Sequence, residues 1–226
     1  PKWLSKLDEL REAGINPYPS ADQLRVTHVS TALHEACADL TDPAEAGFGE
    51  VAIGGRLMFR NSFGKVMFLR VQDRGEQTVP GEDQEGNPEL KGGTIQVFAR
   101  KNDLGDEVYA ALKKLDIGDI VWARGPIMRT RTGELTVRAV DCRLAAKTVA
   151  PFPDRFHGLT DIQTRSRQRY VDLFMNSSTR DLFRTRSRIV RYVREFFEAR
   201  DYMEVETPML QTLPGGAAAR PFSTHH

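Results

Sequence analysis

Four phenylalanine side chains in the strand-like part of the sequence could take part in nucleic-acid recognition, because aromatic rings can stack on unpaired bases. They are Phe59, Phe63, Phe68 and Phe98. Small β-barrels that bind single strands combine such rings with polar side chains that read the edges of the bases. The residue pattern alone favours a core position for each ring, so base stacking is the less favoured of the two interpretations.

Phosphate binding is a second candidate chemistry, because arginine is concentrated in one stretch. Residues 155–200 carry eleven Arg and no Lys against five acidic residues, whereas the net charge of the whole chain is +1. An excess of this kind suits a surface that faces phosphates. A solvated helix face with ion pairs between subunits explains the same excess equally well.

Other chemistries find little support in the sequence. Cys37 and Cys142 lie far apart, without a second Cys or His at ligand spacing, so we expect reduced, buried thiols and no zinc site. Neither a Walker-type loop nor a Gly-rich dinucleotide motif is present. No run approaches the roughly 20 apolar residues that span a bilayer, and the first residues lack a signal-peptide pattern. We therefore expect a cytoplasmic protein without membrane contact.

The periodicity of the sequence predicts the strands and helices that carry these residues. Alternating patterns predict five strands, with a bend or bulge at Gly54-Gly55 in the first and a hairpin that joins the last two. The predicted strands cover 50–60, 66–72, 94–99, 119–130 and 134–145. A short helix at 106–115 lies between the third and fourth strands. This order is that of an OB-fold, a five-stranded and partly open barrel, although other small barrels share it.

Helices are predicted on both sides of the barrel. Ser30 or Thr31 is the expected N-cap of the second helix, and Gly14 closes the first. The predicted helices cover 3–13, 30–40, 161–175 and 178–200, and a strand is predicted at 202–206. Residues 77–93 are expected to form a surface loop, because they are rich in Gly, Pro and acidic residues.

The residues after the barrel carry motifs of a known family. Residues 203–208, Met-Glu-Val-Glu-Thr-Pro, follow the basic helix and lead to residues 213–222, Leu-Pro-Gly-Gly-Ala-Ala-Ala-Arg-Pro-Phe. This arrangement resembles motif 1 and the start of the amino-acid pocket in class II lysyl-tRNA synthetases of the bacterial type. Residues 114–120, 154–159 and 167–173 are similar to the family as well. Motif 1 recurs across class II enzymes, whereas the Gly-Gly-Ala-Ala-Ala-Arg-Pro-Phe run points to the lysine enzymes.

The resemblance implies an α+β protein that contains the amino-terminal half of such an enzyme. We expect an N-terminal helical segment at 1–48, an OB-fold anticodon-binding domain at 49–148 and a hinge at 149–176. Residues 177–226 would be the truncated start of the class II catalytic domain.

The resemblance also assigns roles to particular residues. Phe68 would stack on the central anticodon uridine, and Gln96 and Glu134 would read the edge of that base. An amide suits uracil because it can donate to a carbonyl oxygen and accept from N3–H. Arg60, with Asn61 as its substitute, would contact a phosphate or a base.

Further roles fall in the catalytic part. The backbone of Gly216 would contact the α-amino group of bound lysine. The dimer interface would include an apolar stripe on the basic helix and the end of motif 1, with the residues Ile189, Val193, Phe197 and Pro208.

The full-length protein would then be a homodimeric lysine–tRNA ligase that uses ATP and Mg²⁺ to activate lysine and transfers it to tRNA(Lys). The family's second and third motifs, which bind ATP and Mg²⁺, have no counterpart in these 226 residues. We therefore expect this chain to bind the anticodon but not to aminoacylate, with no catalytic residue, metal ligand or cofactor of its own. Two alternatives stay open: a non-catalytic tRNA- or single-strand-binding module, and an aspartate or asparagine–tRNA ligase.

Overall fold

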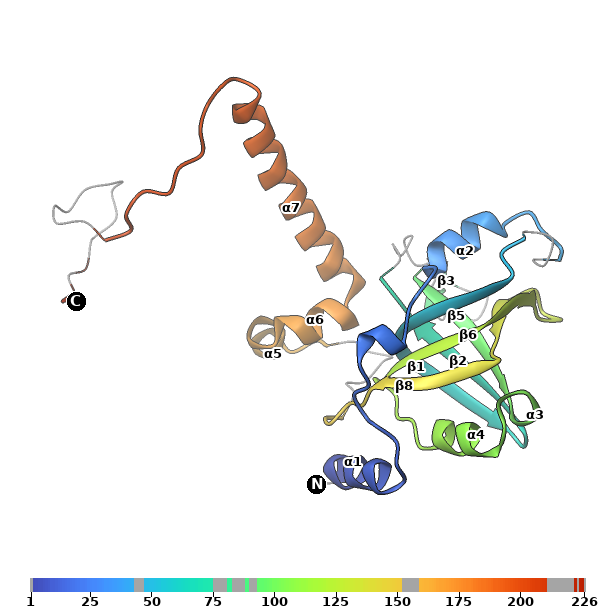
Figure 1. Cartoon of the computed structure of the whole chain (residues 1–226). Coiled ribbons are helices and arrows are strands. Elements are labelled where there is room, and N and C mark those ends of the chain that lie inside the picture. The colour runs from blue at the N-terminus through green and yellow to red at the C-terminus, as the bar shows by residue number, and fades with distance from the viewer. Residues whose placement is uncertain are drawn as a thin grey trace. The chain divides into compact units, whose positions relative to one another are not determined.

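The alternating pattern that begins at residue 50 builds a six-stranded sheet in the computed structural model (Figure 1). Its strand order is β1-β2-β5-β7-β6-β8, and β1 also pairs with β6, so that the first five strands close into a ring. Every pairing in this sheet is antiparallel except that of β5 with β7. The strands are β1 (Glu50–Phe63), β2 (Val66–Gln72), β5 (Thr94–Arg100), β6 (Ile120–Arg129), β7 (Leu135–Arg138) and β8 (Asp141–Ala146).

The structure describes residues 2–42, 47–74, 81–82, 88–89, 93–151, 159–210, 222 and 224–225. The chain divides into two units, Pro1–Asp154 and Arg155–His226. Within the predicted loop 77–93, the short strands β3 (Gly81–Glu82) and β4 (Pro88–Glu89) pair with each other.

The first strand exchanges one partner for another directly after Gly54-Gly55, where a bend or bulge was predicted. Residues up to Arg56 pair with β6, and residues from Arg56 onward pair with β2. A Cβ atom at Gly55 would lie 2.2 Å from the carbonyl oxygen of Gln72, so only glycine allows the two strands to approach this closely. The register then shifts between Leu57 and Phe59.

One predicted strand is two strands in the structure. Residues 134–145 were expected to continue without a break, but β7 ends at Arg138 and β8 begins at Asp141. The reason is that β7 pairs with both β5 and β6, whereas β8 pairs with β6 alone. The chain must therefore leave β5 after residue 138, and the backbone amides of Ala139 and Val140 donate to Phe98 and Arg124 at this step.

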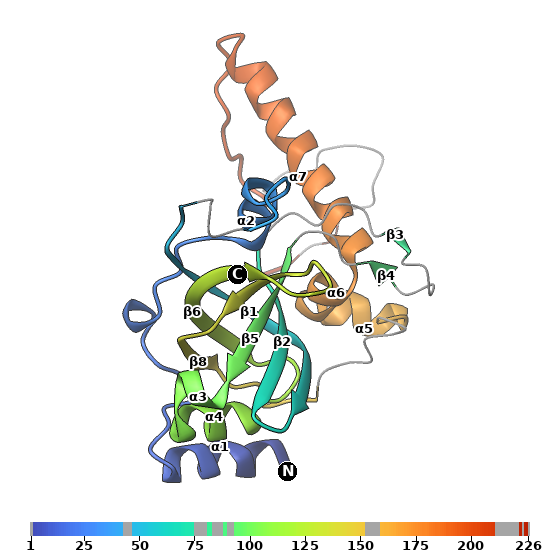
Figure 2. The ribbon, with the colours of Figure 1, turned by 90° about the vertical axis from the view of Figure 1, so that its right-hand side faces the viewer.

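The interior of the ring is filled by alternate residues of the strands. Leu57, Leu69, Val97, Val121 and Val137 are fully buried. Full burial of each such side chain contributes about 1.5–3 kcal/mol. The helices α2 (Ser30–Ala36) and α4 (Asp106–Lys113) lie at opposite ends of the ring, and both contribute to this core (Figures 1 and 2).

The expected N-cap of the second helix is wrong. Ser30 is the first residue of α2, and its predicted capping role is taken by Asp73, just after β2. The Asp73 carboxylate accepts from the backbone amide of Ser30 and, at 2.7 Å, from its hydroxyl. A carboxylate is a strong acceptor at the positive end of a helix. The cap is therefore supplied from a distant part of the chain, which no local pattern predicts.

A buried ion cluster ties α1 (Lys2–Glu12) to the residues that precede β6 and to the residue that follows β8. The Lys147 ammonium lies 2.8 Å from both Asp116 and Asp119, and Lys6 of α1 also contacts Asp116. The side chains of Lys147 and Asp119 are fully buried. Burial by itself would raise the pKa of Asp116, but hydrogen bonds from Lys147 and Lys6 outweigh it and lower the pKa below its ordinary value.

The remaining helices of the first unit are η1 (Ala21–Gln23) and α3 (Lys101–Leu104). No helix among the described residues is long and apolar enough to cross a membrane.

The second unit contains α5 (Ile162–Arg167), α6 (Arg169–Met175) and α7 (Ser177–Glu198). Their centre is the fully buried carboxylate of Asp172, which accepts hydrogen bonds from Arg165, Arg169, Asn176 and Thr179. Burial favours a raised pKa for Asp172, but these hydrogen bonds, with that from Asn176 the largest, hold the pKa below its ordinary value.

The strand predicted at 202–206 is wrong as a description of this structure. The residues after α7 run without regular secondary structure from 202 to 208. A strand exists only when its backbone groups pair with a neighbour, and no strand lies in the described part of the second unit.

Candidate nucleic-acid interface

The register of three adjacent strands places a row of side chains on the outer face of the sheet. Asn61 of β1 is opposite Phe68 of β2, which is opposite Phe98 of β5. The neighbours Met67, Leu69 and Val97 are fully buried. Because successive residues of a strand point to opposite faces, Asn61, Phe68 and Phe98 lie on the face away from the core.

Phenylalanine rings form a cluster on this outer face. The ring centroids of Phe68 and Phe98 are 5.1 Å apart, and those of Phe63 and Phe68 are 6.5 Å apart. Phe63 and Phe59 are 61% and 46% exposed, and Phe68 and Phe98 are half-buried. The interpretation of all four rings as core residues is therefore wrong, and the rings offer apolar surface to a partner.

A row of polar side chains lies beside these rings on the same face, two residues further along β2 and two residues earlier in β5. Arg70 of β2 is opposite Gln96 of β5, which is opposite Thr136 of β7. The Gln96 amide donates to Thr136 Oγ1 at 3.0 Å, and that hydroxyl donates to the Glu134 carbonyl oxygen at 3.0 Å. These bonds fix the side chain of Gln96 against the sheet. Thr136 is fully buried, and its neighbours Leu135 and Val137 belong to the core on the other side of the strand.

Glu134 joins the same row through an ion pair. Its Oε1 lies 3.3 Å from Nη2 of Arg70, and both side chains are 41% exposed. The structure thus brings Phe68, Gln96 and Glu134 together on one face, as predicted, and adds Arg70. Sequence reasoning missed Arg70, although its position two residues after Phe68 in a strand is a sufficient signal.

Arg60 is not brought to this face. It is opposite the buried Leu69, so it lies on the other side of β1 from Asn61. Its Nη1 donates to the carbonyl oxygens of Lys113 at 2.7 Å and Leu115 at 2.6 Å, at the end of α4. Arginine is a favourable partner there because the last carbonyls of a helix lack intrahelical donors and carry partial negative charge.

A cationic edge continues the aromatic row. Arg138 of β7 is opposite Phe98, and Arg100 lies two residues further along β5. Both guanidinium groups bind Asp103, at 3.1 Å and 2.8 Å. The hydrogen bond from Arg100, followed by that from Arg138, lowers the pKa of Asp103. The face therefore combines aromatic rings, an oriented amide, a carboxylate and arginines; rings that stack, polar groups that bind base edges and positive charge are features of single-strand interfaces.

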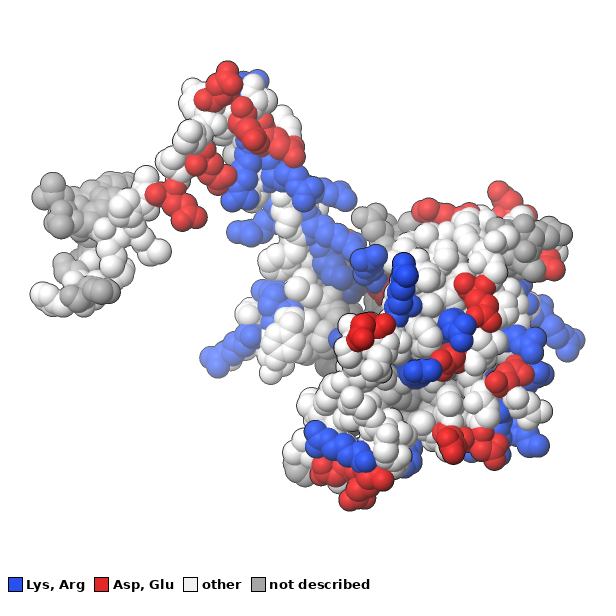
Figure 3. All heavy atoms as spheres, viewed as in Figure 1, with Lys and Arg blue, Asp and Glu red and all other residues white. Residues whose placement is uncertain are grey.

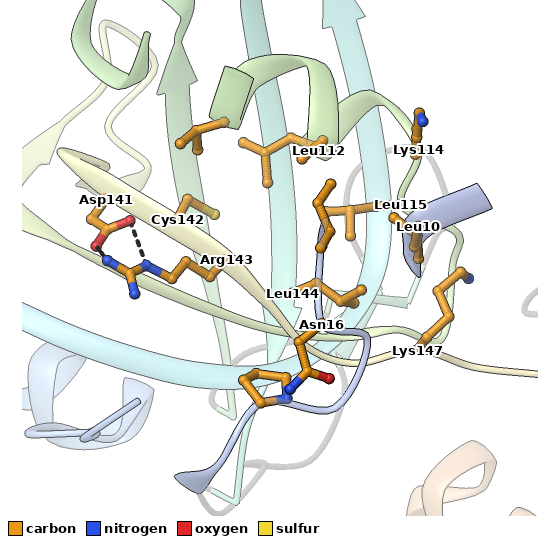
Figure 4. A pocket seen from close by; sticks show the side chains of 14 residues that line it. Leu10, Asn16, Leu112, Lys114, Leu115, Asp141, Cys142, Arg143, Leu144 and Lys147 are labelled. Carbon is orange, nitrogen blue, oxygen red and sulfur yellow. Dashed lines mark hydrogen bonds and ion pairs between the residues drawn. The ribbon is translucent and has the colours of Figure 1, made fainter. Parts of the chain in front are cut away.

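A cavity of about 330 Å³ in the first unit lies apart from this face. Figure 4 shows leucine side chains from α1, from α4 with the residues that follow it, and from β8 gathered around it. Two of its polar residues, Arg143 and Lys147, form ion pairs with Asp141 and with the buried cluster. Cys142 also lines it, and burial, followed by the charge of Asp141, raises the pKa of this thiol to about 12. These features describe packing between α1 and the sheet.

In the second unit, three of the predicted interface residues lie exposed on α7. Ile189 is 59% exposed, and Val193 and Phe197 are each 47% exposed. Pro208, after the helix, is exposed as well. Gly216 lies outside the described residues. Among the residues that are described, no three His, Cys, Asp or Glu side chains are placed to hold a metal ion.

Comparison with known proteins defines the class first. Residues 161–226 match the model of the family described as "tRNA synthetases class II (D, K and N)". Along nearly its whole length the chain is similar to lysine–tRNA ligases, and the resemblance found in the motifs is confirmed.

Three of these relatives illustrate the match. Lysine–tRNA ligase of Dichelobacter nodosus is 45% identical over 222 residues, which are 98% of this chain and 41% of the relative. Those of Burkholderia vietnamiensis and Magnetococcus marinus are 46% and 41% identical, again over 98% of this chain and 40% of each relative. The chain thus spans about two fifths of the length of the relatives that it matches.

Proposed function

We propose that residues 49–148 are an OB-fold domain that reads the anticodon of tRNA(Lys) within a lysine–tRNA ligase. The support for the fold is the ring β1-β2-β5-β7-β6, closed by β1–β6, with its single parallel pair and with α3 and α4 between β5 and β6. That is the strand order and helix position of a five-stranded Greek-key barrel. The support for the function is the similarity to lysine–tRNA ligases across the domain.

The observation that carries the proposal is the joint placement of Phe68, Gln96 and Glu134 on one outer face. Phe68 offers its ring to the central uridine, and Phe98 supports that ring from 5.1 Å. Stacking of one base on an aromatic ring contributes about 1–3 kcal/mol. Gln96 is one strand away from Phe68, and its amide can pair with the donor and acceptor of a uracil edge.

Asn61 takes the place of Arg60 in this proposal. Asn61 is directly opposite Phe68 on the same face, whereas Arg60 is bound to carbonyl groups on the other side of the strand. Arg70 and Arg138 supply the positive charge that the face needs to hold the sugar–phosphate backbone of the loop.

For the whole protein we propose the activity of its relatives, the ATP-dependent attachment of lysine to tRNA(Lys) in the cytoplasm. ATP supplies the leaving group that activates the lysine carboxylate, and Mg²⁺ offsets the charge of the phosphates. The described residues hold no metal-binding cluster, so we assign no step of that chemistry to them. The domain boundaries 1–48, 49–148, 149–176 and 177–226, and the contact of Gly216 with lysine, are part of the same proposal.

A homodimer is proposed on the basis of the exposed apolar stripe of α7. Ile189, Val193 and Phe197 recur at the spacing of one helix face and expose about half of their surface or more. Together with Pro208 they form the surface that we expect a second copy to cover, because a stripe of this kind is rarely left in water.

Binding of the chain to anticodon stem-loops tests the proposed function. Stem-loops with UUU, GUU and UCU anticodons are compared at one fixed, moderate salt concentration. We expect UUU and GUU to bind alike and UCU to bind more weakly, since only UCU lacks the central uridine. Equal affinity for all three, with a steep dependence on salt, would show that the contacts are to phosphate alone.

A further inference from the structure

The basic character of the second unit is concentrated on α7. Residues 180–194 contain six Arg, no Lys and one Asp. Figure 3 shows the blue side chains gathered along this helix. Arginine in place of lysine favours partners with planar or paired oxygens, because its guanidinium can bind a phosphate through two hydrogen bonds.

Four of these arginines share one face of the helix. Arg184, Arg188, Arg191 and Arg194 follow one another at intervals of four, three and three residues, which is the spacing of side chains on one side of an α-helix. At about 1.5 Å per residue the row is about 15 Å long. Ile189, which belongs to the apolar stripe, lies on the opposite side, since one residue turns the helix by about 100°. This row of four arginines is termed the basic face.

The two central members of the basic face are exposed and carry no partner among the described residues. No hydrogen bond or ion pair within the described part of the chain involves the side chain of Arg188 or Arg191. At the ends of the row, Arg184 lies 3.5 Å from Asp181, and Arg194 lies 3.0 Å from Glu204. The second pair is 60% and 68% exposed, and such pairs contribute little to stability.

Like charges at this spacing repel one another, so the basic face is destabilising until an anion binds it. Glu195, four residues after Arg191, and Glu198, four residues after Arg194, lie on the same side of the helix and offset part of the charge at the C-terminal half of the row. A second copy of the chain is expected on the apolar stripe, which lies on the other side of the helix. Within the described part of the chain, the basic face therefore lies away from the surface that the second copy is expected to cover.

We propose that the basic face of α7 binds the sugar–phosphate backbone of a double-helical part of the tRNA. This inference rests on the proposed function, because it takes tRNA as the partner. A nucleic-acid duplex carries one charge per about 1.7 Å of its axis, so a row of about 15 Å meets several phosphates at once. The contact carries no sequence information and adds affinity to the reading of the anticodon by the first unit.

The test compares Arg188→Gln with Arg186→Gln in the 226-residue chain. Both changes remove one exposed arginine from α7, and glutamine keeps the helix propensity nearly constant. Arg186 lies about 160° around the helix from Arg188, on the side of the apolar stripe, so it is outside the basic face, and the oligomeric state of both variants is checked by sedimentation. Each variant is titrated with an unmodified tRNA(Lys) transcript and with a single-stranded heptanucleotide that carries the anticodon-loop sequence, over a series of salt concentrations.

We expect Arg188→Gln to weaken tRNA binding by roughly fivefold or more and to reduce the slope of log affinity against log salt by about 1. Arg186→Gln should leave both quantities nearly unchanged, and neither variant should alter binding of the heptanucleotide. Equal effects of the two variants on tRNA would overturn the proposal, since only the total charge would then matter. A change in oligomeric state of Arg188→Gln, measured by sedimentation without any loss of tRNA affinity, would assign the basic face to a second copy. If the wild-type chain does not bind the heptanucleotide specifically, the proposed anticodon function fails; this outcome is separate from the test of the basic face.

Discussion

Replacement of Lys147 by methionine should strongly destabilise the first unit. The Lys147 ammonium is fully buried and lies 2.8 Å from both Asp116 and Asp119. Methionine fills a similar volume but leaves the fully buried Asp119 carboxylate without a cation. Removal of one partner from a buried ion pair costs about 3–5 kcal/mol, because the remaining charge is neither solvated nor paired.

The expected loss can be expressed as a shift in melting temperature. For a unit of this size, 1 kcal/mol corresponds to about 3 °C, so the variant should melt about 9–15 °C below the wild type. The assay is thermal unfolding followed by tryptophan fluorescence, since Trp122 is buried in the same unit. Lys114→Met is the matched control, because Lys114 is exposed and lies nearby in the sequence.

The difference in stability between the wild type and Lys147→Met should also depend on pH. Because the pKa of folded Asp116 is lowered, its stabilising contribution is complete above the unfolded value of about 4 and is lost as pH falls through the folded value. The gap in stability should therefore narrow below about pH 4. A shift of less than about 3 °C near neutral pH, or one equal to that of Lys114→Met, would refute the reasoning about the buried cluster.

Three further predictions concern the anticodon face, the second unit and the thiols. Phe68→Leu should weaken binding of a UUU stem-loop by roughly 5- to 150-fold, because stacking on the ring is lost. Phe68→Tyr keeps a ring and should retain most of the affinity. Equal losses in the two variants would show that stacking on Phe68 does not contribute to binding. Asp172→Asn should lower the helix content of the second unit near neutral pH, as seen by far-UV circular dichroism. Because the pKa of Asp172 is lowered, wild-type stability should fall only below about pH 4, and a pH-independent signal there would contradict this. Cys142 should not react with a thiol reagent in the folded protein near neutral pH, since its pKa is raised to about 12; rapid labelling without unfolding would contradict its burial.

Sequence reasoning succeeded where the pattern is local. The alternation of the sequence was sufficient to place Phe68 in the second strand and Gln96 in the third, and the structure has them in the corresponding strands β2 and β5. The glycine pair at 54–55 marks a close approach to Gln72 that only glycine permits, and the register irregularity of β1 follows a few residues later, between Leu57 and Phe59. The motifs after residue 150 were sufficient to find the resemblance to lysine–tRNA ligases, and the comparisons agree with it.

The errors concern features that depend on distant parts of the chain. Arg60 and Asn61 are neighbours, and which of them faces outward depends on the register with β2 and on the shift between Leu57 and Phe59. The hydrogen bonds that cap the start of α2 come from Asp73, which lies 43 residues away from Ser30. The strand predicted at 202–206 needs a neighbouring strand, which the described part of the second unit does not provide.

The most direct test of the anticodon proposal combines a change in the protein with a change in the RNA. Affinities of the wild-type chain and of Gln96→Ala are measured for UUU and UCU stem-loops at the same salt concentration. One well-placed pair of hydrogen bonds discriminates by about 1–3 kcal/mol, so the wild type should prefer UUU by roughly 5- to 150-fold. Gln96→Ala should reduce that preference toward unity while it retains most of the affinity for UCU. An unchanged preference in the variant would show that Gln96 does not read the central uridine.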